Sequence, residues 1–262
     1  MMAVRPSKWL DRKTRQRALR QWAEIAEEVE FMAPPRIRRL TQEAHLLRAS
    51  LNRFFMRGDR KAAVSRVALD ALHLPGGTDW RWRPGFMAGQ ISPRGIAAPA
   101  PGTRLGDRAA LWHDCPEPSM VLEQLPSPRA TDLSPYCMRL EVFSFAGNFL
   151  SVSIDLPTEA LDGLTRNHIL RLEVSALIER PMKIYSRLNI GHGPNTDELV
   201  KEFGTIEPGL ASQQVIEFDL AYTEMNEKRL EKIWLDLIFD SPAMNAVEIR
   251  ELFISRHLRA EF

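Results

Sequence analysis

Runs in which apolar and polar residues alternate constrain the fold of this 262-residue chain more than any other feature. Side chains two residues apart in a strand point to the same face of a sheet, so each run buries one face and exposes the other. Such runs cover residues 150–156, 170–176, 184–190, 216–220 and 247–255. Turns, without intervening helices, separate them. The order predicts a mostly β protein, built as an antiparallel β-sandwich and preceded by an α-helical N-terminal region.

The segment KIWLDLIFD, residues 232–240, is apolar on both faces of a strand. Trp234 and Ile238 lie on one face, and the other face carries Ile233, Leu235, Leu237 and Phe239. A strand that is covered on both faces lies inside a sheet, with a neighbour on each side. The sequence therefore predicts a central strand here.

Proline, glycine and serine are dense between residues 75 and 135, which excludes long helices and favours turns and edge strands. Within this region the stretch DWRWRPGF alternates Trp with Arg. We expect Trp80 and Trp82, which share one face, to anchor the core, with Arg81 and Arg83 facing outward. The alternative is an aromatic platform displayed to a sugar. On the first interpretation, this region supplies the first strands of the sandwich.

Helical periodicity dominates the N-terminal part of the chain. The stripe of a first amphipathic helix consists of Trp22, Ile25, Ala26 and Val29, and we expect this helix to end at Pro34-Pro35. A second stripe has the alternating three- and four-residue steps of a heptad repeat, and it consists of Ile37, Leu40, Ala44, Leu47, Leu51 and Phe54. Gly58-Asp59 is a predicted stop or kink before a shorter helix over residues 60–74.

Charge divides the chain in the same place. Residues 1–70 hold 16 of the 35 Lys and Arg and 8 of the 34 Asp and Glu, a formal charge of +8, which leaves −7 for the rest. The predicted domains are a basic helical arm, residues 1–70, and a β-sandwich domain, residues 75–262. The arm is expected to dock on an acidic surface of a larger assembly, and protein, nucleic acid and lipid headgroups all stay open as that surface. The alternative is that the arm faces the acidic part of its own chain, or water.

The residues expected to dock this arm are of two kinds. The basic ones are Arg12, Lys13, Arg15, Arg17 and Arg20, and the apolar ones are Ile37, Leu40, Leu47, Leu51 and Phe54. A narrow apolar stripe cannot bury itself on an isolated hairpin, so it needs a partner. Two partners stay open: a second copy of the chain, which would make a homo-oligomer, and the chain's own sandwich.

The C-terminal strands resemble a known family. Residues Trp234 to Asp240, the loop Ser241 to Ala246, and a last strand of the form V-x-I-x-x-L-x-I-S over Val247 to Ser255 follow the order found in galactose-binding-like, jelly-roll carbohydrate-binding modules. The resemblance covers about residues 137–256. More loosely, a basic helical arm on such a sandwich resembles head-spike proteins of alphaproteobacterial gene transfer agents, which are phage-like particles. The resemblance to carbohydrate-binding modules implies a jelly-roll fold that binds a polysaccharide.

Carbohydrate modules stack an aromatic ring on the apolar face of a sugar and hold its hydroxyls with polar side chains. The candidate aromatic residues are Trp112, Tyr185 and Tyr222, and the candidate polar partners are Arg187, Asn189, His192 and Asn195. Tyr185, Arg187 and Asn189 lie on the less apolar face of one predicted strand. An ordinary solvated face is the alternative reading of the same residues.

The predicted function is a non-catalytic binding or adaptor protein, whose arm docks on an assembly such as a phage-like particle and whose sandwich recognises a glycan or a partner protein. The rival is a carbohydrate-active hydrolase or lyase, which needs two carboxylates across a cleft. Strand positions that could supply them are Glu141, Glu173, Glu217 and Asp219. The sequence WHDC, residues 112–115, places His, Asp and Cys side by side without the geometry of a catalytic site.

No cofactor is expected, and no metal site is predicted, because the six His and two Cys lack paired-ligand spacing. Calcium braces many sugar-binding sandwiches; the carboxylates that would serve it here have no distinguishing spacing, and they are Asp155, Asp162, Asp236 and Asp240. The segment NIGHGPNTDELVKEF, residues 189–203, does not have phosphate-loop spacing, and it predicts a turn and a short helix capped by Asn195 or Thr196. Without basic–aromatic patterning in the acidic part, nucleic acid is not an expected partner.

The expected location is the cytoplasm or a released particle. No apolar run approaches the roughly 20 residues that span a bilayer, so no membrane span is expected. The basic N-terminus is not followed by the apolar region of a signal peptide. Cys115 and Cys137 are therefore expected to be reduced thiols.

Overall fold

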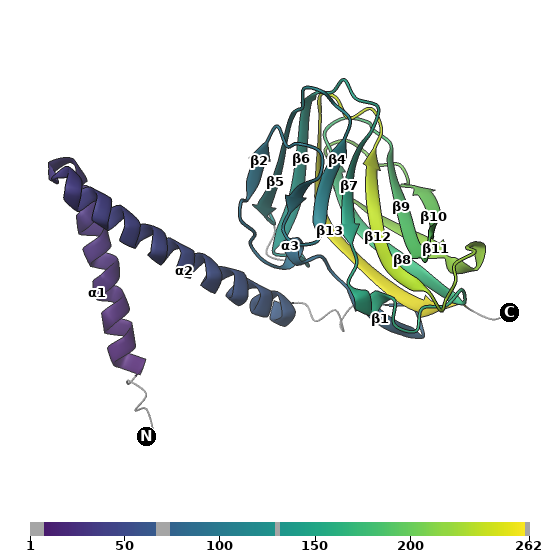
Figure 1. The fold of residues 1–262 in the computed structure, drawn as a ribbon, viewed down its shortest axis with the longest axis horizontal. Coiled ribbons are helices and arrows are strands. Elements are labelled where there is room, and N and C mark those ends of the chain that lie inside the picture. The colour runs from purple at the N-terminus through teal and green to yellow at the C-terminus, as the bar shows by residue number, and fades with distance from the viewer. Residues whose placement is uncertain (1–7, 67–73, 129–131, 260–262) are drawn as a thin grey trace. The chain divides into compact units, whose positions relative to one another are not determined.

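The fold is known from a computed structural model, which describes residues 8–66, 74–128 and 132–259 (Figure 1). The chain divides into two compact units, Met1–Phe54 and Phe55–Phe262. The first is helical. The second contains all the strands and forms a mostly β structure, which confirms the predicted fold class.

The helical unit consists of α1 (Lys8–Glu27), the short 3-10 helix η1 (Val29–Phe31) and α2 (Pro34–Arg66), which continues past the unit boundary. Pro34 and Pro35 begin α2 and do not end α1, so this prediction is wrong. The reason is that the first residues of a helix need no intrahelical hydrogen bond from their N–H groups, which makes proline acceptable there. No stop occurs at Gly58-Asp59 either, since α2 continues to Arg66, and part of the expected third helix, residues 67–73, lies outside the described residues. None of the described helices is long and apolar enough to cross a membrane.

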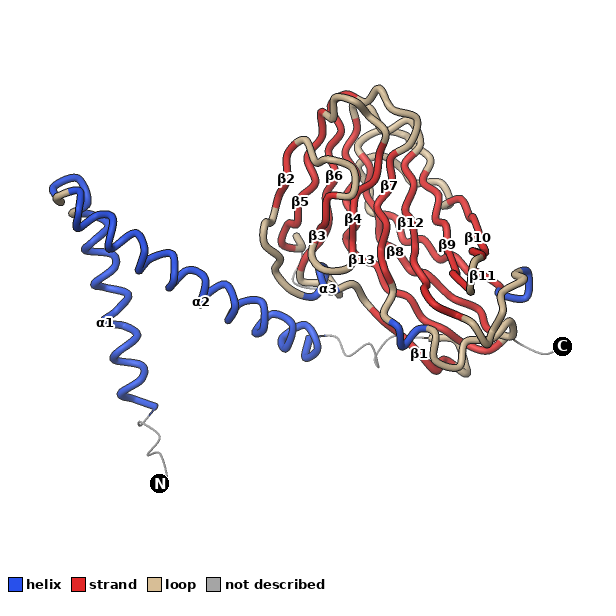
Figure 2. Tube along the Cα trace, in the orientation of Figure 1, coloured by secondary structure: helices blue, strands red, loops and turns tan. Residues whose placement is uncertain are grey.

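Two antiparallel sheets form the sandwich (Figure 2). The first has the order β11 (Ser212–Asp219), β8 (His168–Ile178), β13 (Asn245–Leu258), β6 (Tyr136–Ser144), β5 (Ser119–Pro126) and β2 (Gly95–Ala97), and β1 (Thr78–Trp82) pairs with the end of β13. The second has the order β10 (Asn195–Glu202), β9 (Ile184–His192), β12 (Leu230–Phe239), β7 (Leu150–Asp155), β4 (Ala109–His113) and β3 (Thr103–Leu105). Short helical turns lie between strands: α3 (Gly85–Ala88), η3 (Thr158–Ala160) and η4 (Leu220–Tyr222).

The core lies between the two sheets, where one face of each strand is apolar. In β7, for example, Leu150, Val152 and Ile154 are fully buried, and they alternate with more polar residues on the outer face. Strand β12 pairs with β9 on one side and β7 on the other, so the predicted central strand is confirmed. Its second apolar face is only half-buried, because it faces outward from the sandwich.

The Pro- and Gly-rich region supplies β1 to β5, in both sheets, as expected. Trp80 and Trp82 lie on the inner face of β1 and pack against the core, which confirms their anchoring role. Arg81 is exposed, but Arg83 is not, so this part of the prediction is wrong. Strand β1 ends at Trp82, and beyond it the alternation no longer holds. The Nε atom of Arg83 lies 3.0 Å from Glu251 Oε1, and both side chains are 6% exposed.

The expected short helix after residue 195 is also wrong. Residues 195–202 form the edge strand β10, which pairs with β9 in a register that joins Asn195 to His192 and Leu199 to Leu188. A turn at Gly193, whose φ is +61°, connects the two strands. Leu199 packs against the core, and this burial, together with the strand pairing, outweighs the weak local preference for a helix.

Candidate functional site

A groove of about 480 Å³ lies on the outer face of the second sheet. Its lining comes from strands β4, β7, β9 and β12 and from the residue before β7, and it consists of Trp112, Phe149, Ser151, Ser153, Arg187, Lys232, Trp234, Asp236 and Ile238. Every strand that contributes lies near the middle of the sheet, so backbone pairing on both sides fixes the position of these side chains.

Small residues form the floor of this groove. Ser151 of β7 pairs with Trp112 on one side and with Ile238 on the other, and Ser153 pairs with Ala110 and Asp236 in the next row. Residues directly paired in antiparallel strands have side chains on the same face. A row of small side chains between large ones therefore makes the surface concave. Within the described part of the chain, the hydroxyls of Ser151 and Ser153 make no hydrogen bond.

Two aromatic side chains form one wall. Trp112 and Phe149 are each 46% exposed, which is unusual for residues of this size. The indole of Trp112 lies against Gly102, where a Cβ atom would come within 3.2 Å of the indole Cη2. Gly102 also has a φ of +80°, a conformation that side chains disfavour. Glycine at this position thus leaves room for the Trp112 ring.

Asp114 holds the turn that carries Phe149. Its Oδ1 accepts hydrogen bonds from the backbone N–H of Asn148 (2.7 Å) and of Phe149 (3.1 Å), and its Oδ2 accepts one from Asn148 Nδ2 (2.8 Å). The N–H of Phe149, followed by the Asn148 side chain, lowers the pKa of Asp114. A Cβ atom at Gly147 would clash with Asp114 and with the backbone of Cys115, so the turn fits closely around this carboxylate.

The opposite wall contains Trp234. The Nζ atom of Lys232 lies 4.7 Å from the centroid of the Trp234 ring, a cation–π distance. The same Nζ is 3.0 Å from Asp155 Oδ1 on the neighbouring strand. The lysine is therefore held by a ring and a carboxylate together.

A carboxylate lies between the two walls. Asp236 is 4% exposed, and its Oδ2 accepts hydrogen bonds from Arg187 Nε (3.1 Å), Arg187 Nη2 (2.9 Å) and Asn189 Nδ2 (2.9 Å). Arg187 also lies 3.3 Å from Glu198 Oε2. The described residues provide no donor to Asp236 Oδ1.

The structure brings together three of the residues that the sequence singles out. Trp112 and Arg187 line the groove, and Asn189 supports Asp236 from behind. Tyr185 lies on the same outer face, where it pairs with Ile238 at the border of the groove.

The other three candidates lie elsewhere. His192 is buried at the end of β9, with Nε2 3.5 Å from Asp197 Oδ2, and Asn195 pairs with it across the β9–β10 turn. Tyr222 is 79% exposed, but it belongs to η4, which follows β11 of the first sheet. Their assignment as ligand-binding residues stays a prediction.

Sequence reasoning missed most of the groove. The lining residues that it did not select as ligand-binding are Phe149, Ser151, Ser153, Lys232, Trp234, Asp236 and Ile238. Part of the groove leaves a trace in the sequence. Residues 232–240 are apolar on both faces of the strand, and this pattern fits an outer face that binds a ligand. Only the register between β4, β7 and β12, however, brings Trp112, Ser151 and Ile238 into one row.

The carboxylates considered for catalysis do not line this groove. Arg171 pairs with both Glu173 (2.8 Å) and Glu217 (2.9 Å), on strands of the first sheet. Glu141 pairs with Arg139 on β6, and Asp219 lies 3.4 Å from Arg259. Among the described residues, no group of three or more His, Cys, Asp and Glu could hold a metal ion.

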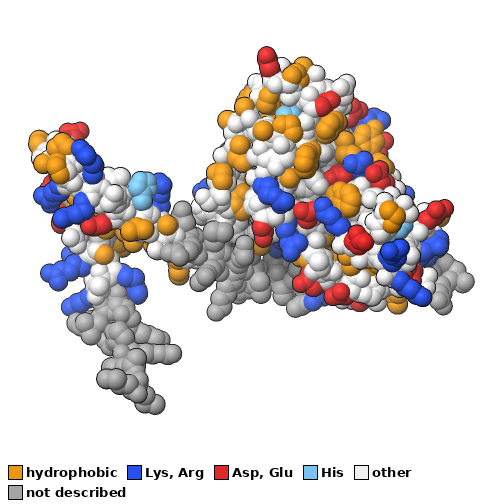
Figure 3. All heavy atoms as spheres, viewed as in Figure 1, with side chains coloured by type: hydrophobic (Ala, Val, Ile, Leu, Met, Phe, Trp, Pro, Cys, Tyr) orange, Lys and Arg blue, Asp and Glu red, His pale blue; other side chains and the backbone are white. Residues whose placement is uncertain are grey.

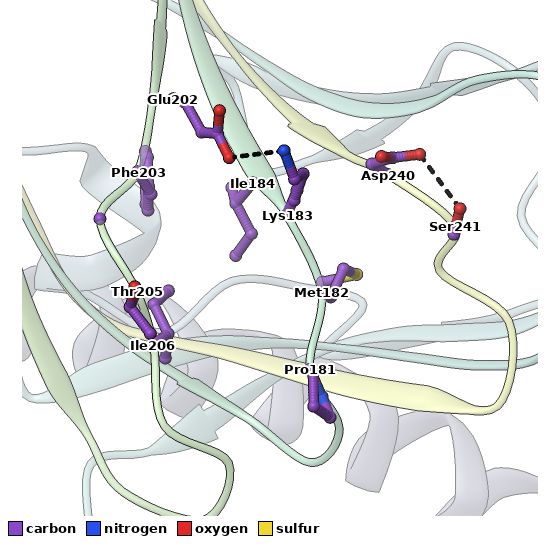
Figure 4. A pocket seen from close by; sticks show the side chains of 11 residues that line it. Pro181, Met182, Lys183, Ile184, Glu202, Phe203, Thr205, Ile206, Asp240 and Ser241 are labelled. Carbon is purple, nitrogen blue, oxygen red and sulfur yellow. Dashed lines mark hydrogen bonds and ion pairs between the residues drawn. The ribbon is translucent and has the colours of Figure 1, made fainter.

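A second hollow, of about 440 Å³, lies where β9 begins and where β10 and β12 end (Figure 4). Lys183 Nζ lies 3.1 Å from Glu202 Oε1, and Ser241 Oγ donates a 3.1 Å hydrogen bond to Asp240. The bond to Glu202 raises the pKa of Lys183. These polar groups bind one another, and the aromatic ring in the lining, Phe203, is buried. The groove on the second sheet is therefore the better candidate site.

The whole chain, residues 1–262, matches a protein family of unknown function (DUF6478). It belongs to this family. No curated protein matches the sequence.

Several carbohydrate-binding β-sandwich modules are similar in structure. The CBM22-1 xylan-binding domain from Paenibacillus barcinonensis has a TM-score of 0.38 at 10% identity, over 64% of this chain and 94% of that one. A sugar-binding protein from Bacteroides thetaiotaomicron, described as putative, has a TM-score of 0.41 at 11% identity, over 64% and 96%. The CBM22-1–GH10 modules of a Clostridium thermocellum xylanase have a TM-score of 0.38 at 11% identity, over 57% of this chain.

The chain spans 29% of the length of that xylanase. Scores and identities this low establish no residue of this chain as equivalent to a ligand-binding residue of those modules. The comparisons give no support to the resemblance to head-spike proteins of gene transfer agents.

Proposed function

We propose that the sandwich is a non-catalytic carbohydrate-binding module and that its ligand lies in the groove of the second sheet. The observation that carries the proposal is the exposure of Trp112 and Phe149, at 46% each, beside a floor of serines. Exposed aromatic rings at a concave surface favour the apolar face of a sugar ring, because stacking removes both surfaces from water.

The polar groups of the groove fit the hydroxyls of a sugar. Asp236 Oδ1 can accept a hydrogen bond, and the hydroxyls of Ser151 and Ser153 can donate and accept one. Asp236 cannot turn away, because Arg187 and Asn189 hold its other oxygen. A rigid acceptor loses little entropy when it binds a ligand.

The charges of the groove favour an uncharged glycan. Its two cationic side chains are both paired: Arg187 with Asp236 and Glu198, and Lys232 with Asp155. An anionic polysaccharide would meet three carboxylates and two cations that are already neutralised. A neutral chain of sugars does not meet this repulsion.

The outer face of the first sheet provides an internal contrast. Its charged residues pair along and across the strands, as in Arg139–Glu141, Arg171–Glu173, Arg171–Glu217 and Arg250–Glu248. A face of satisfied ion pairs is an ordinary solvated surface. Within the sandwich, the aromatic groove thus distinguishes one outer face from the other.

The helical arm extends the proposal to an adaptor role, in which the arm holds the module on an acidic surface of a larger assembly. The support is the basic character of α1: Arg15, Arg17 and Arg20 are exposed, and Figure 3 shows Lys and Arg side chains along this helix in blue. Reversing these three to Glu should lower the fraction of protein that co-sediments with large particles from the native cells. Unchanged co-sedimentation would contradict the adaptor role.

The groove is tested with a glycan array, followed by calorimetry with the neutral oligosaccharide that binds best. Trp112→Ala should lower the affinity roughly 10-fold or more, because it removes the exposed stacking surface. Phe143→Ala is the matched control: Phe143 is 52% exposed on β6 of the other sheet, so its loss should leave the affinity unchanged. Absence of binding to any glycan, or an unchanged affinity of Trp112→Ala, would overturn the proposal.

A further inference from the structure

Besides the groove of the second sheet, the apolar stripe of α2 is a surface that we expect to bind a partner. Helix α2 is continuous from Pro34 to Arg66, so the residues with heptad spacing form one apolar seam along the helix. Along this seam Ile37, Leu40 and Ala44 are half-buried, whereas Leu47 is 42% and Leu51 46% exposed. Large aliphatic side chains in such a row gain stability when a second surface covers them.

The spacing of the apolar residues indicates which kind of surface can cover the seam. Steps of three and four residues place Ile37, Ala44 and Leu51 at the a positions of a heptad, and Leu40, Leu47 and Phe54 at the d positions. Side chains at a and d fit as knobs into the holes of a facing helix that has the same spacing. A second copy of α2 has this spacing by necessity.

The charged residues beside the seam favour one orientation of the two α2 helices relative to each other. In a parallel, in-register pair of helices, the residue at g of one helix faces the residue at e of the next heptad in its partner. Between residues 36 and 50, this rule joins Glu43 to Arg48 of the second copy, and Arg36 to Thr41 of the second copy. The first pair is attractive, and the second brings no like charges together. An antiparallel pair joins e to e and g to g, which loses the Glu43–Arg48 attraction.

We propose that α2 forms a parallel, in-register coiled coil with α2 of a second copy of this chain. Among the described residues of one copy, Glu43 makes a loose 4.0 Å pair with the exposed Arg39, and Arg48 contacts His45 at 3.3 Å. Both side chains are exposed. The dimer does not depend on the proposed function. Where that function holds as well, the dimer carries two grooves and binds a repeating glycan with a gain in avidity.

The first experiment measures the mass of the full-length protein by light scattering after size exclusion, over a series of concentrations. The wild type should have the mass of a dimer at the higher concentrations. Leu51→Glu should reduce it to a monomer, because a charge at an a position must be desolvated on pairing. Leu46→Glu is the matched control: Leu46 is 71% exposed and lies off the seam, so this variant should remain a dimer.

The second experiment exchanges the charges. Glu43→Arg and Arg48→Glu should each weaken the dimer, because each places like charges across the interface, and the double variant should restore it. Restoration is the readout that a change in helix stability alone would not produce, since residues five apart do not pair within one helix.

Three outcomes would overturn the proposal. A wild-type protein that is monomeric at every concentration has no such interface. A dimer that survives Leu51→Glu lies on another surface. A double charge exchange without restoration rules out the parallel register.

Discussion

Lys232 lies over the indole of Trp234, with Nζ 4.7 Å from the ring centroid, while Asp155 holds the same Nζ at 3.0 Å. The lysine occupies a surface on which a sugar would otherwise stack. The two tryptophans of the groove therefore differ: Trp112 is open to a ligand, and Trp234 is covered in part.

This difference predicts unequal and coupled contributions to binding. Trp234→Ala should lower the glycan affinity much less than Trp112→Ala does. In a Lys232→Ala background, where the ring is uncovered, Trp234→Ala should cost several-fold more than it does alone. Calorimetry on the four variants of this cycle measures the coupling. Equal effects of Trp234→Ala in both backgrounds would show that Lys232 does not limit access to the ring.

Asp236 is expected to support both folding and binding. Asp236→Asn leaves the partly buried guanidinium of Arg187 and the buried amide of Asn189 without their charged acceptor, so the free energy of unfolding should fall by about 1–3 kcal/mol. The affinity for the glycan should fall as well. Urea denaturation and calorimetry measure the two effects. Glu198→Gln is the control, because this half-exposed partner of the same arginine should change the unfolding free energy by less than about 1 kcal/mol. Equal effects of the two variants would contradict the role of Asp236.

Asp114 is a positioning residue for Phe149. Asp114→Ala should lower the glycan affinity with little change in the unfolding midpoint, because the turn loses its acceptor while the sheet remains paired. The pKa of Asp114 in the folded protein lies below its usual value. The ionised carboxylate therefore stabilises the turn at pH values above the pKa that Asp114 has in the unfolded chain. This stabilisation is lost as the pH falls through the lower pKa that Asp114 has in the folded protein. Asp240→Ala, in the exposed turn after β12, is the control. An affinity of Asp114→Ala equal to that of the wild type would show that the turn does not position Phe149.

The buried pair of Arg83 and Glu251 predicts a stability change that depends on pH. Burial raises the pKa of Glu251, and Arg83 and Ser134 oppose this shift. A raised pKa means that Glu251 favours folding in its protonated form, so its contribution is present at low pH and lost as the pH rises through the folded pKa.

Arg83→Met removes the charge that makes an ionised Glu251 tolerable in the core. The loss of unfolding free energy should therefore be about 3–5 kcal/mol at pH 7 and clearly smaller at pH 5, where Glu251 can take up a proton. Urea denaturation at both values measures it. Glu251→Gln in the Arg83→Met background should abolish the pH dependence. An equal loss at pH 5 and pH 7 would contradict this explanation.

The sequence predicts correctly the strands whose two faces differ in polarity. It predicts poorly the strands whose faces are alike. Residues 150–156 and 170–176 alternate strictly, because one face packs in the core, and both form strands. Strand β10 has little such contrast, since at the edge of its sheet most of its side chains are exposed, and its local sequence predicts a helix instead. Pairing with β9, which no local pattern encodes, determines its structure.

The groove was harder to predict for a related reason. Trp112 and Arg187 could be selected by residue type, but they are far apart in the sequence, and the register of four strands joins them. The pattern of Trp234 and Ile238 predicts a covered face, because a ligand-binding face of a central strand has the same apolar pattern as a buried one. Burial distinguishes the two, and burial is a property of the folded chain.

The central claim is that a neutral glycan binds between Trp112 and Trp234. The most direct measurement follows the indole N–H signals of all six tryptophans by NMR during titration with the oligosaccharide selected on the array. The account predicts that the signals of Trp112 and Trp234 shift in a saturable way while those of Trp80 and Trp82, which pack against the core from the other sheet, stay in place. Unchanged signals for Trp112 and Trp234 at saturating oligosaccharide would contradict it.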